Sequence, residues 1–108
     1  METIEIKSLK TENPVNPWDF VVDSRSVLGN PFYESERYTS EDACEAYRKY
    51  FYNRINEFDT IILGEVRVLY CAYIEYGKLN LFCWEAPRKC HANTIREYLY
   101  AYLSSNIL

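Results

Sequence analysis

The sequence predicts a small α/β domain with a Rossmann-like open sheet, mostly parallel and flanked by about three helices. Three observations favour this fold class. Short β-rich runs alternate with longer stretches in which apolar residues recur at helical spacing. The order strand, strand, helix, helix, strand, helix is typical of parallel strands joined by crossovers. A chain of 108 residues can bury one core but not a second, so residues 1–108 are predicted to form one domain.

Two strands are predicted near the start of the chain. Residues 3–9 alternate apolar and charged side chains, which is typical of a strand at or near a sheet edge with one face in water. A loop with two Asn and two Pro follows over residues 11–17. The apolar run 18–23 ends at Asp23, which predicts a buried strand that presents a carboxylate at its C-terminal end.

The segment after this strand is predicted to be a loop of defined shape. Gly29 permits a positive φ, and Pro31 keeps Asn30 out of the helical region. Phe32 follows directly.

Two helices are predicted next. Thr39 and Asp42 have the spacing of a capping box before a helix over residues 40–55. Residues 59–76 fit a second helical stripe, with Gly77 as its stop, although residues 66–74 could instead form a strand that leads into a hairpin. We favour the helix. The two cysteines in these segments, Cys44 and Cys71, are predicted to be packing residues.

The last β-rich run, residues 79–84, leads into a loop rich in reactive side chains. Pro87 prevents the strand from continuing, and helical spacing resumes over residues 91–104. Open α/β folds place ligand sites where a strand, a short loop and a helix N-terminus meet. Since right-handed crossovers put both polar loops at one edge, we expect loops 29–32 and 83–91 to line one crevice.

Charge and hydropathy exclude several classes of partner. The net charge is −4 and no basic block exceeds the pair Arg88-Lys89, which argues against binding of duplex nucleic acid. The first residues do not resemble a secretory signal, and no apolar run approaches bilayer length. We therefore expect a cytoplasmic protein with reduced thiols and no membrane partner. Eleven tyrosines fit a small core padded with their rings better than a stacking surface for bases.

Two motifs resemble a known family. They are Val22-Asp23-Ser24-Arg25 with Gly29-Asn30-Pro31-Phe32, and Leu81-Phe82-Cys83-Trp84 with Cys90-His91. In this order and spacing they resemble the bacterial and phage family of domain of unknown function 4326, over about residues 19–103. Glu85 stands where that family commonly has a second Cys, which gives a more distant likeness to domain of unknown function 488. The resemblance implies a Rossmann-like α/β fold and no established activity.

The polar side chains of the two loops favour a pocket for a small anionic, nucleotide-like ligand. Arg25 and Arg88 could supply charge-assisted contacts, and the start of the last helix favours an anion. Phe32 or Trp84 could stack on a planar group. The predicted ligand-binding residues are Asp23, Arg25, Gly29, Asn30, Phe32, Trp84 and Arg88.

Catalysis on such a ligand is a second hypothesis. Cys90 and His91 lie at a predicted helix start, where a thiol can become nucleophilic, and Glu85 could act as general acid or base. A zinc site that combines them with Cys83 is disfavoured, because the spacing lacks the paired ligands of structural zinc modules. We predict no metal and no cofactor. The alternative is a non-enzymatic interaction protein whose polar loops are structural, and the oligomeric state stays open.

Overall fold

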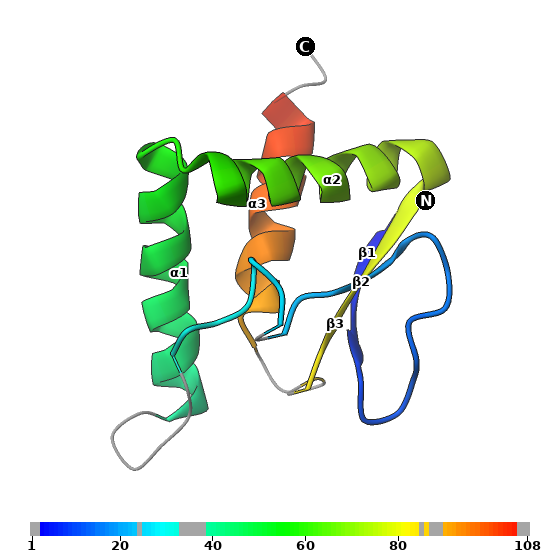
Figure 1. Cartoon of the computed structure of the whole chain (residues 1–108), viewed down its shortest axis with the longest axis horizontal. Helices are drawn as coiled ribbons and strands as arrows, with labels where there is room; N and C mark the ends of the chain where they lie inside the picture. The colour runs from blue at the N-terminus through cyan, green and yellow to red at the C-terminus, as the bar shows by residue number, and fades with distance from the viewer. Residues whose placement is uncertain (1–2, 24, 33–38, 85, 87–89, 106–108) are drawn as a thin grey trace.

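The computed structural model describes residues 3–23, 25–32, 39–84, 86 and 90–105. Within them the chain forms three strands and three helices in the order β1, β2, α1, α2, β3, α3 (Figure 1). The predicted α/β class and the single small open sheet are both confirmed.

The sheet has β3 at its centre. β1 (Thr3–Ser8) and β2 (Asp19–Val21) flank β3 (Lys78–Cys83), and both pairings are parallel. Leu79 and the residues after it in β3 are buried, because helices pack against the central strand. β2 is shorter than the predicted run over residues 18–23, although one further backbone hydrogen bond continues the pairing on each side of it.

The three helices begin and end close to the predicted positions. α1 (Ser40–Asn56) starts with the predicted capping box, in which Asp42 N donates to Thr39 Oγ1 over 3.1 Å and Thr39 N donates to the Asp42 carboxylate. α2 (Thr60–Tyr76) ends at Gly77, which has a φ of 73°. A helix over residues 60–76 rules out the alternative strand over residues 66–74. α3 (Ala92–Ser105) completes the fold.

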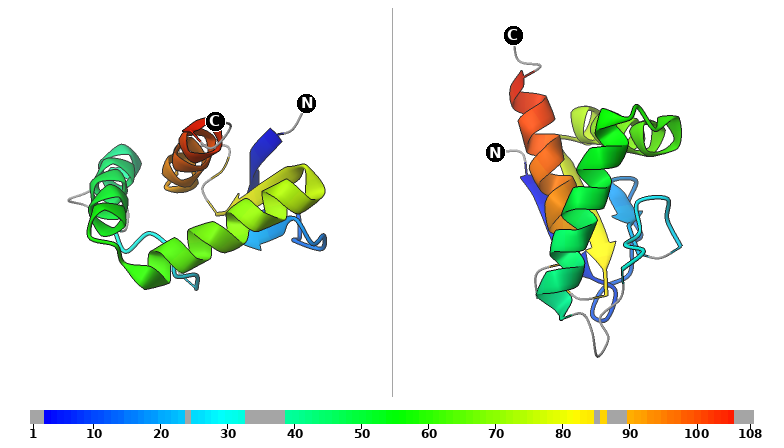
Figure 2. Two further views of the ribbon diagram at one scale, coloured as in Figure 1. Left: turned by 90° about the horizontal axis from the view of Figure 1, so that it is seen from above. Right: turned by 90° about the vertical axis from the view of Figure 1, so that its left-hand side faces the viewer.

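The three helices do not all run in one direction. α1 and α3 run in roughly the same direction, and α2 crosses both of them (Figures 1 and 2). α2 packs on β3, whereas α3 packs on β1 and β3. The core between the helices and the sheet contains large side chains that are fully buried, among them Tyr47, Phe51, Leu79, Leu81 and Ile95.

One burial prediction is wrong. Cys44 is buried as expected, but Cys71 is exposed on α2. The buried stripe of α2 consists of Ile62, Val66, Leu69 and Tyr73 with Ala72 beside them, and Cys71 lies on the other side of the helix. No helix among the described residues is both long and apolar enough to span a membrane.

Candidate functional site

The chain segments that follow β2 and β3 leave the sheet at the same edge. The crevice expected between loops 29–32 and 83–91 stays a prediction, because residues 85 and 87–89 lie outside the described part of the chain. Val22 N donates to Phe82 O over 3.0 Å, so the carboxyl ends of β2 and β3 lie side by side. The indole of Trp84, just after β3, then reaches Asp23, just after β2. The carboxyl edge of a parallel sheet is where open α/β folds bind ligands.

Asp23 is the centre of this edge. Its carboxylate is buried and accepts hydrogen bonds from Arg25 N (3.0 Å), from Arg25 Nε (3.0 Å) and from Trp84 Nε1 (3.0 Å), while Arg25 Nη2 lies 2.8 Å away. The hydrogen bond from the Arg25 side chain is the main cause that lowers the pKa of Asp23, and the Arg25 backbone and Trp84 add to it against the effect of burial. Asp23 is therefore ionised at neutral pH.

The two partners of Asp23 face the solvent. The Arg25 side chain is 70% exposed and Trp84 is 46% exposed, although the carboxylate that holds them is only 6% exposed. A buried anion thus fixes a guanidinium and an indole next to each other at the surface. These two groups are suited to an anionic and a planar part of one ligand.

The Gly29–Phe32 loop packs against α1. Asn30 Nδ2 donates to Ala43 O over 3.3 Å, and Asn30 Oδ1 accepts from Phe32 N over 2.8 Å. Phe32 meets the ring of Tyr50 edge to face. Among the described glycines, Gly77 has a positive φ and Gly29 does not. The loop therefore does not use the positive φ that Gly29 would permit. The Asn30 amide fixes the loop in place.

His91 is buried between the two loops. Its Nε2 donates to the carbonyl oxygen of Val22, and its ring lies edge-on to Tyr47 with centroids 5.1 Å apart. The Tyr47 hydroxyl donates to Leu28 O over 2.7 Å, and burial raises the pKa of Tyr47. His91 and Tyr47 therefore join the segment before α3 and helix α1 to the loop after β2.

Cys90, the predicted nucleophile, is 3% exposed, and its sulfur lies 2.9 Å from that of Cys83. Its backbone N–H donates to Asn93 Oδ1 over 2.9 Å. Glu85 and Arg88 lie outside the described residues, so their assigned roles stay predictions. No group of three or more potential metal ligands comes together in the described part of the chain.

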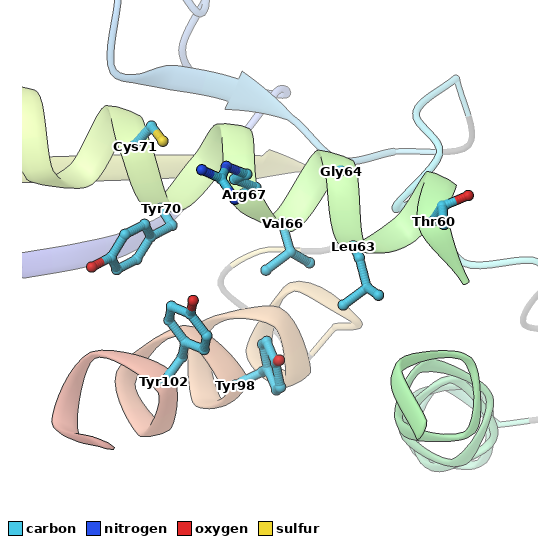
Figure 3. Close-up of a pocket in the computed structure, with 9 residues that line it drawn as sticks. All are labelled: Thr60, Leu63, Gly64, Val66, Arg67, Tyr70, Cys71, Tyr98 and Tyr102. Carbon is cyan, nitrogen blue, oxygen red and sulfur yellow. The ribbon is translucent and has the colours of Figure 1, made fainter. Parts of the chain in front are cut away.

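Sequence reasoning missed a groove between α2 and α3. It has a volume of about 400 Å³ and its walls are mainly apolar and aromatic. Leu63 and Val66 point from α2 toward α3, and Tyr98 and Tyr102 project from α3 (Figure 3). Tyr102 meets Tyr70 edge to face at 5.0 Å. The apolar spacing of both helices was visible in the sequence, but it indicates a core face and not the gap left where two helices cross.

Comparison with known proteins gives one match. The model of a family described as Domain of unknown function (DUF4326) matches residues 6–101. The matched range covers β2, β3, α1 and α2 completely and includes every residue discussed at the sheet edge. No curated protein and no solved structure matches the chain.

Proposed function

We propose that this chain, which belongs to the family of domain of unknown function 4326, binds a small anionic, nucleotide-like ligand at the carboxyl edge of its sheet. One observation carries the proposal: the buried Asp23 carboxylate holds both the exposed Arg25 guanidinium and the exposed Trp84 indole. A side chain that served only to close the loop would not need to orient two ligand-binding groups toward water.

The chemistry of the two groups matches the two halves of a nucleotide. A guanidinium has five N–H donors, so Arg25 retains donors for phosphate oxygens after Asp23 has engaged its Nε and Nη2. The indole of Trp84 offers a face on which a base can stack. Because both side chains are already oriented, little conformational entropy is lost when a ligand binds.

Catalysis by Cys90 and His91 is not part of this proposal. Both side chains are buried: the Cys90 sulfur contacts that of Cys83, and His91 Nε2 donates to Val22 O. A nucleophile and a base must reach the reacting atoms of the substrate, and side chains this buried are closed to a molecule as large as a nucleotide. In the structure Cys90 and His91 support the chain segments that carry Trp84 and Arg25. Ligand binding at the sheet edge requires no chemical role of either side chain.

The test compares two arginines in thermal melts and calorimetric titrations with AMP, ATP, GTP and inorganic phosphate. Arg25→Ala should weaken binding by about ten- to a hundredfold, the effect of losing one charge-assisted contact. Arg54→Ala is the matched control, because Arg54 is an exposed arginine in the last turn of α1, at the opposite end of that helix from Thr39, and in the described part of the chain no hydrogen bond or ion pair joins it to Asp23, Arg25 or Trp84. It should bind as the parent does.

Two results would end the proposal. One is that none of the four compounds raises the melting temperature of the parent chain, since a ligand that binds only the folded state must stabilise it. The other is equal affinity of Arg25→Ala and Arg54→Ala for a compound that does bind. Trp84→Phe separates the two halves of the site, because it keeps a stacking face and removes the N–H that Asp23 accepts.

The alternative, a non-enzymatic interaction protein, is favoured by a different observation. α2 exposes three large aliphatic side chains away from its buried stripe: Ile61 (65%), Val68 (49%) and Ile74 (59%). Ile61 and Val68 are seven residues apart and therefore lie on one face of the helix, and apolar side chains gathered on one exposed face are typical of a protein contact. Light scattering of the purified chain tests this alternative, because self-association that Val68→Lys abolishes would assign α2 to an interface.

A further inference from the structure

Cys83 and Cys90 bring their sulfur atoms into contact inside the core. Cys83 is the last residue of β3 and Cys90 precedes α3, and their Sγ atoms are 2.9 Å apart. Both side chains are buried, with 0% and 3% exposure. A disulfide has an S–S distance of about 2.03–2.05 Å, so bond formation requires the two atoms to approach by less than about 1 Å.

The fold fixes this contact from both sides. Cys83 pairs with Ser8 in the sheet, and its carbonyl oxygen accepts a hydrogen bond from Leu9 N over 2.9 Å. At the other end, Cys90 donates its N–H to Asn93 Oδ1 and accepts from Asn93 N. Each cysteine is therefore anchored through its backbone, and the contact of the sulfurs follows from the fold itself.

We infer that Cys83 and Cys90 form a modification site at which a peroxide produces a reversible intramolecular disulfide. The sulfur of Cys90, which is 3% exposed against 0% for Cys83, loses its proton and attacks hydrogen peroxide, which is far smaller than a nucleotide. The O–O bond breaks, a sulfenic acid forms on Cys90, and the displaced hydroxide takes up the thiol proton and leaves as water. The second sulfur then displaces the sulfenic oxygen as another water molecule. In sum, two thiols and one hydrogen peroxide give one disulfide and two waters, and a thiol reductant reverses the reaction by exchange.

The other two cysteines are placed differently. Cys44 lies on α1 and Cys71 is exposed on α2, whereas Cys83 and Cys90 flank the loop that follows Trp84. The disulfide would tie the residue before Trp84 to the residue before His91. Formation of this disulfide does not depend on whether the sheet edge binds a nucleotide, so a negative result for one proposal leaves the other untouched.

The experiment uses the full chain with Cys71→Ser, which removes the exposed thiol that would couple molecules to one another. Reduced protein is treated with a small molar excess of hydrogen peroxide, unfolded, alkylated with N-ethylmaleimide and mapped by mass spectrometry. We expect the label on Cys44 alone and a peptide in which Cys83 and Cys90 are joined. Dithiothreitol before alkylation should restore the label on all three cysteines.

A second substitution in the same background provides the matched control. Cys44→Ala also removes a buried cysteine, and it should leave the cross-link unchanged, whereas Cys90→Ala should abolish it. The inference is overturned if all three cysteines of the Cys71→Ser chain remain alkylated after peroxide treatment. A disulfide that includes Cys44, or a sulfinic acid at Cys90 in place of the cross-link, would overturn it as well.

Discussion

Replacing Asp23 by alanine should destabilise the chain by about 2 kcal/mol. The substitution removes the acceptor of two hydrogen bonds, both at 3.0 Å: the bond from Arg25 N closes the turn after β2, and the bond from Trp84 Nε1 joins that turn to the end of β3. A hydrogen bond to a charged group contributes about 1.5 kcal/mol or more, so the two give about 3 kcal/mol. Trp84 is 46% exposed, so in the variant its indole N–H can donate to water instead. This lowers the expected loss of stability from about 3 to about 2 kcal/mol. The ion pair with the exposed Arg25 guanidinium is screened by solvent and is left out of the sum.

Urea denaturation at neutral pH measures this loss directly. A double-mutant cycle with Trp84→Phe isolates the hydrogen bond between the indole and the carboxylate, and we expect a coupling of about 1 kcal/mol. If Asp23→Ala unfolds within about 0.5 kcal/mol of the parent, as ordinary surface substitutions do, Asp23 does not hold the loops together and the reasoning is refuted.

The pH dependence of stability gives an independent check on Asp23. Its folded-state pKa lies below the ordinary value of 3.8, so the ionised carboxylate contributes its full stability above that value. The contribution is lost as the pH falls through the folded pKa. Asp23→Ala should therefore lose less stability than the parent between pH 5 and the acid limit of folding, and parallel curves for the two proteins would contradict the assignment.

Three further predictions concern the rest of the fold. Tyr47→Phe should cost about 1–2 kcal/mol in urea denaturation, because the Leu28 carbonyl loses a buried donor at 2.7 Å, and an unchanged midpoint would contradict this. Gly64→Ala should stabilise the chain by roughly 0.5–1 kcal/mol in thermal melts, since the added methyl group in α2 meets nothing within 4 Å; a lower melting temperature would show that it clashes. Alkylation of the native protein, followed by peptide mass spectrometry, should label the exposed Cys71 before the buried Cys90, and the reverse order would show that α3 opens readily.

The signals that the sequence carries reliably are local ones. The capping box of Thr39 and Asp42 and the helix stop at Gly77 depend on residues within one helical turn, and the structure confirms both. Cys71 was placed wrongly although the information was present. At about 100° per residue it lies on the opposite side of the helix from Leu69 and Tyr73, which belong to the buried stripe.

The sheet edge that carries the candidate site could be predicted from the sequence, but the contacts between its side chains could not. The pattern of a buried strand ending in a polar residue places Asp23 at the sheet edge, and parallel topology places Trp84 near it. Their hydrogen bond joins residues 61 positions apart, and the spacing of residues cannot specify which side chains meet over such a separation. The bond of His91 to Val22 O joins residues 69 positions apart and could not be read from the sequence either, and a catalytic role for His91 stays a prediction.

The strand order also determines when the sheet can form during synthesis. β1 and β2 both pair with β3, which is made last, so neither N-terminal strand has its native partner until residues 78–83 have left the ribosome. α1 and α2 can form through local contacts before that point, whereas the strands that carry Ile4 and Phe20 lack the strand with which they pair. A nascent chain that stops before Lys78 therefore exposes two unpaired strand edges and is a target for chaperones and for aggregation.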